Sequence, residues 1–192
     1  MDGSDAGESG THSGNGQGEP SPNMSTPGDQ DVLPGRLASA SATVLVEVME
    51  LQHTNNSGNV HGGTIMRMVD TAAGLAAARH CHGRVVTAAI DEMSFLAPAH
   101  VGDLLTIYAM VNDANRTSME VGVRVEVEQI PSGEVRHVSS AHLIFVALGE
   151  DGRPTAVPPV IAVSEDEKRR QEHARIRREQ RLLRRRSIDR VQ

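Results

Sequence analysis

The sequence predicts a single α+β domain in which an antiparallel β-sheet wraps around one long central α-helix, with a charged helix added at the C-terminus. Three observations predict it. One helical stretch is too apolar to be covered on one side only, one strand-like run precedes it, and four more follow at short intervals. A sheet that curls around the helix buries such a helix on most sides.

The chain of 192 residues divides into three segments by charge. Residues 1–36 hold six acidic side chains and one basic one, and they are rich in Gly, Ser and Pro, so we expect a disordered tail. Residues 37–163 have a net charge of −6 and supply the apolar residues of the folded domain. Residues 164–192 have a net charge of +5 and predict an Arg-rich helix or tail.

Composition excludes several classes of protein. One cysteine cannot form an intramolecular disulfide, and the first twenty residues do not resemble a secretory signal, so we expect a cytoplasmic protein. The apolar run 143–148 is far shorter than the roughly 18 residues of a membrane span. With no Trp, one Tyr and two Phe, the chain lacks the stacking side chains of single-strand nucleic-acid platforms, which argues against nucleic acid as a partner.

The elements follow in order. Residues 41–52 alternate valines with other residues at the strand period of two, and the polar stretch 54–59 predicts a turn. His61-Gly62-Gly63 then leads into the helix predicted for 64–79, whose apolar positions are Ile65, Met66, Met68, Val69, Ala72, Ala73, Leu75 and Ala76.

Four further strands are predicted over 85–97, 104–113, 117–130 and 135–148. In the third of these, valines at 121, 123, 125 and 127 alternate with polar residues, which predicts a sheet with one wet face. Residues 164–167 have the form of a capping box, so we expect a solvated C-terminal helix of about five turns.

Two residues of the central helix indicate chemistry. Gly63 stands at its start, where uncovered backbone N–H groups and the positive end of the helix dipole suit an oxyanion or a polarised carbonyl. Asp70 is the one charged residue on the apolar side of the helix, which suits a catalytic carboxylate. The alternatives are a glycine that only permits close packing and an aspartate paired with a hydroxyl or an arginine.

The spacing of Gly63 and Asp70 bears on how they could act together. Seven residues place them on one face of the helix but about 10 Å apart along its axis. A single carbonyl can hardly touch both, so joint action requires two antiparallel helices from two subunits, with Asp70 of one chain beside Gly63 of the other.

The stretches 55–70, 77–81 and 86–91, followed by 116–120 and 152–154, resemble the hotdog-fold acyl-CoA thioesterases, in particular the cytosolic long-chain acyl-CoA hydrolases. The charged extension 164–170 also resembles the end of that branch. The resemblance covers about residues 38–185 and implies hydrolysis of fatty acyl-CoA to free fatty acid and CoA.

The resemblance implies roles for individual residues. Asp70 would be the general base or nucleophile, and Asn55 of the opposite subunit would position water or the carbonyl. The Gly63 N–H would polarise the thioester carbonyl. It also implies a homo-oligomer with the dimer as minimal unit, commonly a hexamer built as a trimer of dimers.

The turn predicted between two strands holds Arg116, Thr117 and Ser118. These residues match a family segment, with a basic residue and hydroxyl side chains, that lies near the CoA phosphates; an ordinary polar hairpin turn is the alternative.

His61 is expected to shape the start of the helix. His80-Cys81-His82 is too weak a pattern for a metal site, and Asp91 is expected to brace the fold. No metal and no cofactor are implied, because CoA is part of the substrate.

Three other functions fit the sequence less well. A hotdog hydratase or dehydratase would place a His and an Asp together, whereas His61 and Asp70 are nine residues apart. A non-catalytic acyl-CoA sensor is disfavoured by the presence of Asn55, Gly63 and Asp70. Binding of nucleic acid or a membrane surface by the C-terminal arginines is disfavoured by the interspersed acidic residues.

Overall fold

The computed structural model describes residues 33–189, so the tail predicted for 1–36 lies almost wholly outside the described residues. The elements in chain order are β1 (Arg36–Leu37), η1 (Ala38–Ser41), β2 (Thr43–Val48), η2 (Leu51–His53), α1 (Gly62–Cys81), β3 (Arg84–Phe95), β4 (Asp103–Ala114), β5 (Ser118–Gln129), β6 (Glu134–Leu148), β7 (Val160–Ile161) and α2 (Glu165–Asp189).

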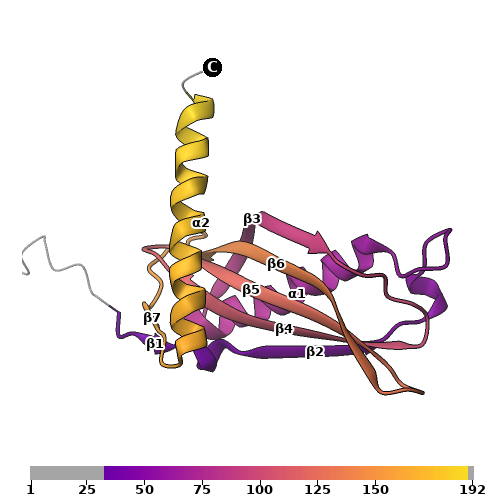
Figure 1. The fold of residues 1–192 in the computed structure, drawn as a ribbon. Helices are drawn as coiled ribbons and strands as arrows, with labels where there is room; N and C mark the ends of the chain where they lie inside the picture. The colour runs from indigo at the N-terminus through magenta and orange to yellow at the C-terminus, as the bar shows by residue number, and fades with distance from the viewer. Residues whose placement is uncertain (1–32, 190–192) are drawn as a thin grey trace, which may run out of the picture. The chain divides into compact units, whose positions relative to one another are not determined.

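The sheet confirms the predicted architecture. Five antiparallel strands stand in the order β2-β4-β5-β6-β3, and α1 packs along one face of that sheet (Figure 1). Ala72, Ala73 and Ala76 of α1 are fully buried there, because small side chains let the helix approach the curved sheet closely. The short strands β1 and β7 form a separate parallel pair that sequence patterning did not predict.

Strand β5 shows the predicted alternation. Val121, Val125 and Val127 are fully buried against the helix side, and Arg124 is exposed on the other side. Strand β2 is shorter than the predicted 41–52, and its valines face outward. Val44 is 58% exposed because the neighbouring positions, such as Thr43, face the core.

Helix α1 is longer than predicted at both ends and less buried. Met66 is 39% exposed and Leu75 is 50% exposed, so the apolar surface of this helix extends beyond what its own sheet covers. A helix with an apolar surface left uncovered in the single chain favours a contact with a second polypeptide.

Helix α2 begins with the predicted capping box. The Glu167 N–H donates to Ser164 Oγ, and the Val163 and Ser164 N–H groups donate to Glu167 Oε2. Those two backbone hydrogen bonds lower the pKa of the Glu167 carboxyl. Within the described residues, neither α1 nor α2 has the length and apolarity to cross a membrane.

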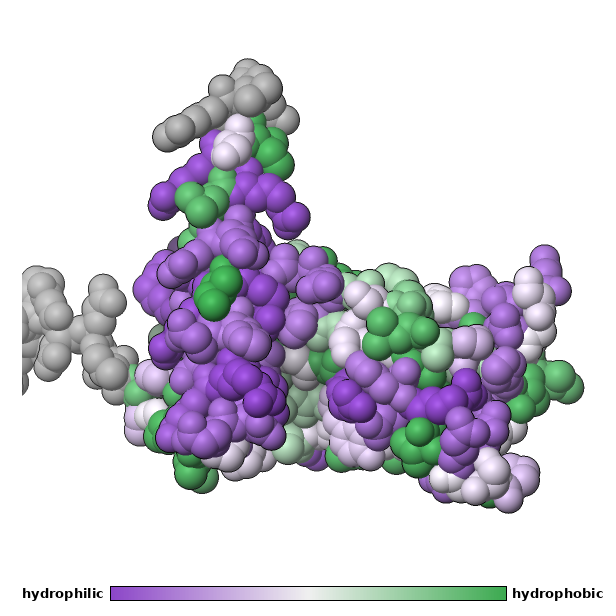
Figure 2. Space-filling view, viewed as in Figure 1, coloured by the Kyte–Doolittle hydropathy of each residue, from purple (hydrophilic) through white to green (hydrophobic). Residues whose placement is uncertain are grey.

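The predicted C-terminal helix is present and most of its described residues are exposed, but it is longer than five turns and one side of it docks on the sheet. Ala174 of α2 is only 2% exposed, because the helix lies across the outer face of the sheet (Figure 1). Figure 2 shows that most of the surface that α2 presents is hydrophilic. Arginines on the docked side pair with carboxylates of three strands, in the contacts Arg175–Asp113, Arg177–Glu120 and Arg181–Asp91.

Candidate active site

Asp70 and Thr87 form the central pair of the candidate site. Helix α1 and strand β3 follow each other in the chain and run antiparallel, so the middle of the helix lies beside the start of the strand. Oγ1 of Thr87 donates a 2.7 Å hydrogen bond to Oδ1 of Asp70. Asp70 is half-buried, so its side chain remains partly accessible to solvent.

Gly63 is placed at the start of α1, but its N–H is already engaged. His61 is the N-cap residue, and its Nδ1 accepts a 2.9 Å hydrogen bond from the Gly63 N–H. The expectation of an uncovered N–H therefore does not hold in the single chain, where the ring of His61 covers it. The structural role expected for His61 is confirmed.

Asn55 lies in the loop before α1. Its Oδ1 accepts hydrogen bonds from the Ser57 N–H at 2.8 Å and the Asn59 N–H at 3.3 Å, and Gly58 adopts φ of 78°, which favours glycine. The side chain is half-buried, held by its own loop.

Asp70, Asn55 and Gly63 are not joined to one another by any hydrogen bond among the described residues. Each has a different partner: Thr87 for Asp70, the loop amides for Asn55 and His61 for Gly63.

Arg116 and Thr117 lie in the predicted turn between β4 and β5, and Ser118 is the first residue of β5. The Ala147 N–H donates to the Thr117 carbonyl, which places the turn at the end of the sheet where β3 begins. The opposite end of β3, at Phe95, contacts the start of α1 at Gly62. Because twelve extended residues span about 40 Å, the turn and the start of α1 lie far apart in one chain.

Strand β3 is an edge strand with an unpaired outer side. Its residues 86–90 are all exposed, with Val86 at 45% and Ile90 at 42%. The strand carries Thr87, so the open edge of the sheet lies directly beside the Asp70–Thr87 pair. An exposed apolar edge strand is a template for pairing with another strand.

His80 has a structural role, as expected. Its ring is 1% exposed, and Nε2 lies 2.8 Å from the Pro158 carbonyl oxygen. Burial lowers the pKa of this imidazole. No group of three or more His, Cys, Asp or Glu side chains with the arrangement of a metal site occurs among residues 33–189.

The residue that sequence reasoning missed is Thr87. The stretch 86–91 that contains it resembles the family, and Asp91 within this stretch braces the fold through Arg181, as predicted. A threonine in a strand carries no signal of its own, because only the packing of β3 against α1 brings its hydroxyl to Asp70. The general possibility that a hydroxyl satisfies Asp70 is confirmed.

Comparisons with known proteins identify the family. Residues 57–134 match the model of the thioesterase superfamily. An uncharacterized acyl-CoA thioester hydrolase of Zymomonas mobilis is 42% identical over 130 residues, which cover 65% of this chain and 83% of that protein. Mouse acetyl-coenzyme A thioesterase is 37% identical over 140 residues, or 71% of this chain, but the match covers only 25% of the mouse protein. The chain thus spans about a quarter of that longer relative.

Solved structures show the same fold. The acyl-CoA hydrolase of Staphylococcus aureus, in complex with butyryl-CoA and CoA, is 33% identical with a TM-score of 0.77, and the alignment covers 82% of this chain and 96% of that one. An apo-hexameric acyl-CoA thioesterase is 36% identical with a TM-score of 0.77, over 79% of this chain and 97% of that one. The chain therefore belongs to the hotdog-fold thioesterase superfamily, among the acyl-CoA thioester hydrolases.

Proposed function

We propose that this protein hydrolyses the thioester of fatty acyl-CoA to a free fatty acid and CoA, at a site shared between two subunits. The observation that carries the proposal is the Asp70–Thr87 pair, an oriented carboxylate at the uncovered edge of α1 and β3. A relative from Zymomonas and a structural neighbour from S. aureus, both of this family, carry names of acyl-CoA hydrolases.

Three substituted variants of the S. aureus hydrolase support the choice of residues. In them one aspartate, one asparagine or one threonine is replaced by alanine. The asparagine precedes the aspartate by 15 positions and the threonine follows it by 17, which are the separations of Asn55, Asp70 and Thr87 here. We infer that these three residues serve the reaction in this chain.

The reaction proposed for Asp70 is general base catalysis. The carboxylate takes a proton from water as the water oxygen attacks the thioester carbonyl carbon, and the carbonyl oxygen becomes an oxyanion. When the carbon–sulfur bond breaks, the proton passes to the CoA thiolate. In the alternative, Asp70 itself attacks the carbonyl carbon and expels the CoA thiolate, which forms a mixed anhydride, and water then attacks the Asp70 carbonyl carbon of that anhydride. A single turnover in ¹⁸O-water puts the label into Asp70 by this route and not by general base catalysis.

Two subunits are needed because of distance. Gly63 lies about 10 Å along the α1 axis from Asp70, and the Arg116 turn lies at the far end of β3. A two-fold axis beside β3 would pair the two edge strands and place Asn55 and Gly63 of one chain near Asp70 of the other. It would also bring the 116–118 turn towards the start of the partner's α1, where these residues would hold the CoA phosphates.

Exposed apolar side chains support this dimer. Val86, Ile90 and Phe95 on β3 and Met66 on α1 lie along the open edge and would be covered by the second chain. Hexameric neighbours support a trimer of such dimers. In the shared site the thioester carbonyl would displace the His61 ring from the Gly63 N–H.

We also propose a cytoplasmic location, because a rat relative 32% identical over 139 residues is named cytosolic.

The experiment that tests the proposal is thiol release from acyl-CoAs of increasing chain length, measured on the purified protein beside Asp70→Asn. Turnover that is lost in the variant supports the thioesterase and reports the chain-length preference. Tight acyl-CoA binding without thiol release would instead identify an acyl-CoA sensor.

A further inference from the structure

The open edge between α1 and β3 continues from the Asp70–Thr87 pair as a row of residues towards the start of α1. On α1, Gly62, Met66 and Asp70 follow one another at intervals of four residues, so they lie along one face of the helix. At one end of the row Thr87 donates its hydrogen bond to Asp70. At the other end the ring of Phe95 lies over Gly62, where a Cβ would be 3.4 Å from the ring atom Cζ. Met66 therefore lies midway between two contacts of α1 with β3.

An irregularity in β3 turns Ile90 towards α1. Thr87 and Ile90 are three positions apart and would point to opposite faces of a regular strand. A register shift between Thr87 and Ala89 changes this. The partners of Thr87 and Ile90 on β6 are two positions apart and belong to the same core cluster as the buried face of α1; they are Phe145 and Leu143. Since paired side chains share a face, Thr87 and Ile90 both face α1.

The middle of this row is uncovered in the single chain. Met66 is 39% exposed and Ile90 is 42% exposed, although both side chains are apolar. Met66 is four residues before Asp70 and so lies about 6 Å from it along the helix axis. Three bonds of an extended chain advance about 3.5 Å, so a linear hydrocarbon that starts at the Asp70 carboxylate reaches Met66 after about five carbon atoms.

The place proposed for the CoA phosphates decides which way an acyl chain runs from Asp70. The 116–118 turn lies at the end of the sheet where β3 begins, because the Thr117 carbonyl accepts from the Ala147 N–H. Met66 and Ile90 lie on the other side of Asp70, towards the start of α1. A thioester held at Asp70, with its phosphates at that turn, therefore points its acyl chain along the row towards Met66.

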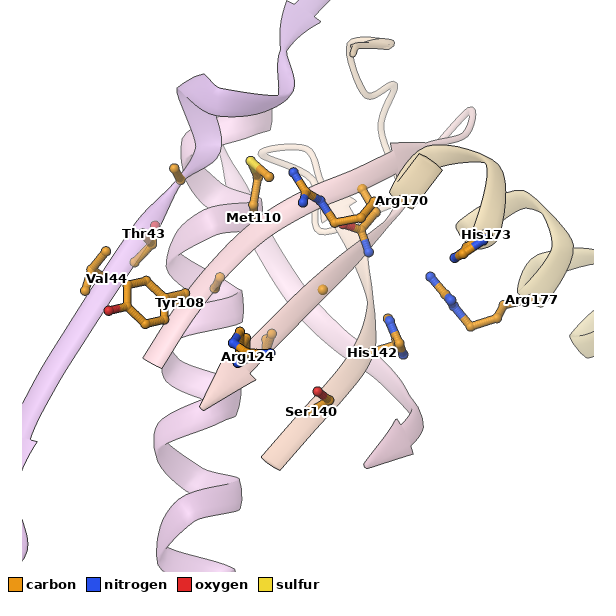
Figure 3. A pocket seen from close by; sticks show the side chains of 15 residues that line it. Thr43, Val44, Tyr108, Met110, Arg124, Ser140, His142, Arg170, His173 and Arg177 are labelled. Carbon is orange, nitrogen blue, oxygen red and sulfur yellow. The ribbon is translucent and has the colours of Figure 1, made fainter. Parts of the chain in front are cut away.

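The cavity under α2 does not lie on this path. It has a volume of about 390 Å³, and Tyr108, His142 and Arg177 are among the residues that line it (Figure 3). It lies on the face of the sheet opposite α1, and the hydrogen-bonded strands β4, β5 and β6 separate it from Asp70. An acyl chain that starts at Asp70 must therefore run on the α1 side of the sheet.

In the proposed dimer Met66 lies at the symmetry axis. When Gly63 of one chain faces Asp70 of the other along two antiparallel helices, the middle of that interval falls between Met66 and Arg67. The row of one subunit therefore meets the row of its partner at the two copies of Met66. Beyond them the second catalytic site begins, so the space for each acyl chain is bounded there.

We propose that Met66 forms the far wall of the acyl channel and sets the length of the acyl chain that the site accepts, with Ile90 as a side wall. This inference rests on the proposed thioesterase function and its two-subunit site. Chains of about five carbon atoms or fewer fit between Asp70 and Met66. A longer chain must push the Met66 side chain aside, which is possible because methionine is unbranched and flexible.

The test compares decanoyl-CoA with butyryl-CoA, as the ratio of their kcat/KM values for thiol release by the full chain. Met66→Ala opens room for about two methylene groups, each of which changes binding about fourfold, so we expect the decanoyl-to-butyryl ratio to rise about tenfold. Met66→Phe replaces a flexible thioether by a rigid ring, and we expect the ratio to fall about fivefold or more. The matched control is Leu75→Ala, at a residue of α1 that is 50% exposed but outside the row, and it should leave the ratio unchanged.

A second measurement does not require turnover. Each Met66 variant is combined with Asp70→Asn, and calorimetry gives the Kd of decanoyl-CoA and of butyryl-CoA. We expect Met66→Ala to favour decanoyl-CoA and Met66→Phe to favour butyryl-CoA, as in the kinetic test. Light scattering verifies that the oligomer persists; if Met66→Ala dissociates it, Met66→Phe decides the question.

An unchanged ratio in the Met66 variants, or a lower ratio in Met66→Ala, would overturn the proposed role of Met66. Thiol release by the native chain in that experiment would leave the thioesterase proposal standing. If the native chain releases no thiol from either substrate, the thioesterase proposal fails, and the Kd ratios still decide whether Met66 bounds the acyl site.

Discussion

The Thr87 hydroxyl donates a 2.7 Å hydrogen bond to the Asp70 carboxylate and so joins the edge strand β3 to the central helix α1. The bond holds Oδ1 of Asp70, and Oδ2 has no hydrogen-bond partner among residues 33–189. Strand β3 is irregular at this point, with register shifts between Thr87 and Ala89 and between Ile90 and Glu92. The irregular part of the strand therefore lies directly beside the candidate base.

Replacement of Asp70 by Asn removes the base and keeps the shape of the side chain. We expect kcat for thiol release to fall by about 10²- to 10⁴-fold, the usual contribution of a general base, with the oligomer and CoA binding unchanged. Steady-state kinetics measures kcat, light scattering measures the oligomer, and calorimetry measures CoA binding. Loss of folding would show that Asp70 is structural.

Replacement of Thr87 by Val removes the hydroxyl but keeps the volume. Without the hydrogen bond the carboxylate of Asp70 is no longer held in one orientation, and we expect kcat to fall by about tenfold or more while KM changes little. Thr87→Ser retains a hydroxyl and should restore most of the rate. Equal loss in the Val and Ser variants would argue against the hydrogen bond as the cause.

Chains that carry Asn55→Ala and chains that carry Asp70→Asn should complement each other. If each site takes Asn55 from one subunit and Asp70 from the other, a mixed dimer contains one site with both native residues. We expect about a quarter of native activity after complete exchange of subunits, because half the dimers are mixed and each has one intact site. Exchange is verified by native mass spectrometry; no recovery after it would exclude the shared site.

The ion pair of Asp91 with Arg181 fixes α2 to the strand that carries Thr87. Its N–O distance is 2.6 Å, and the two side chains are 11% and 24% exposed. Because the pair is only partly accessible, we expect Arg181→Gln to lower the free energy of unfolding by about 1 to 3 kcal/mol. Urea denaturation measures this free energy, and Arg186→Gln, at an exposed arginine of the same helix, is the control. Equal stability of both variants would contradict the predicted role.

Protonation of His80 should destabilise the fold. Burial lowers the pKa of this ring below its value in the unfolded chain, so folding favours the neutral form. The contribution to stability is therefore full above the unfolded pKa of about 6.5 and is lost as pH falls below it. We expect the free energy of unfolding, measured by urea denaturation between pH 7 and pH 5, to depend less steeply on pH in His80→Gln than in the native chain. The same pH dependence in both proteins would argue against His80 as the cause.

Much of the fold followed from the sequence because it depends on local periodicity. The valines of β5 alternate at a period of two, and the small and apolar residues of α1 repeat at helical spacing, so both elements and their buried faces could be predicted. Capping chemistry likewise placed the start of α2 at Ser164. The resemblance over 55–70, which the comparisons confirm, supplied the family.

The tertiary structure alone decided three other features, each of which joins residues distant in the chain. The bond from Thr87 to Asp70 depends on the packing of β3 against α1, and the outward face of Val44 depends on which side of β2 meets the core. The docking of α2 depends on Asp91 and other carboxylates that the sheet brings into one row. Charge patterning within a helix cannot reveal such partners, because it contains no information about which strands will lie beneath it.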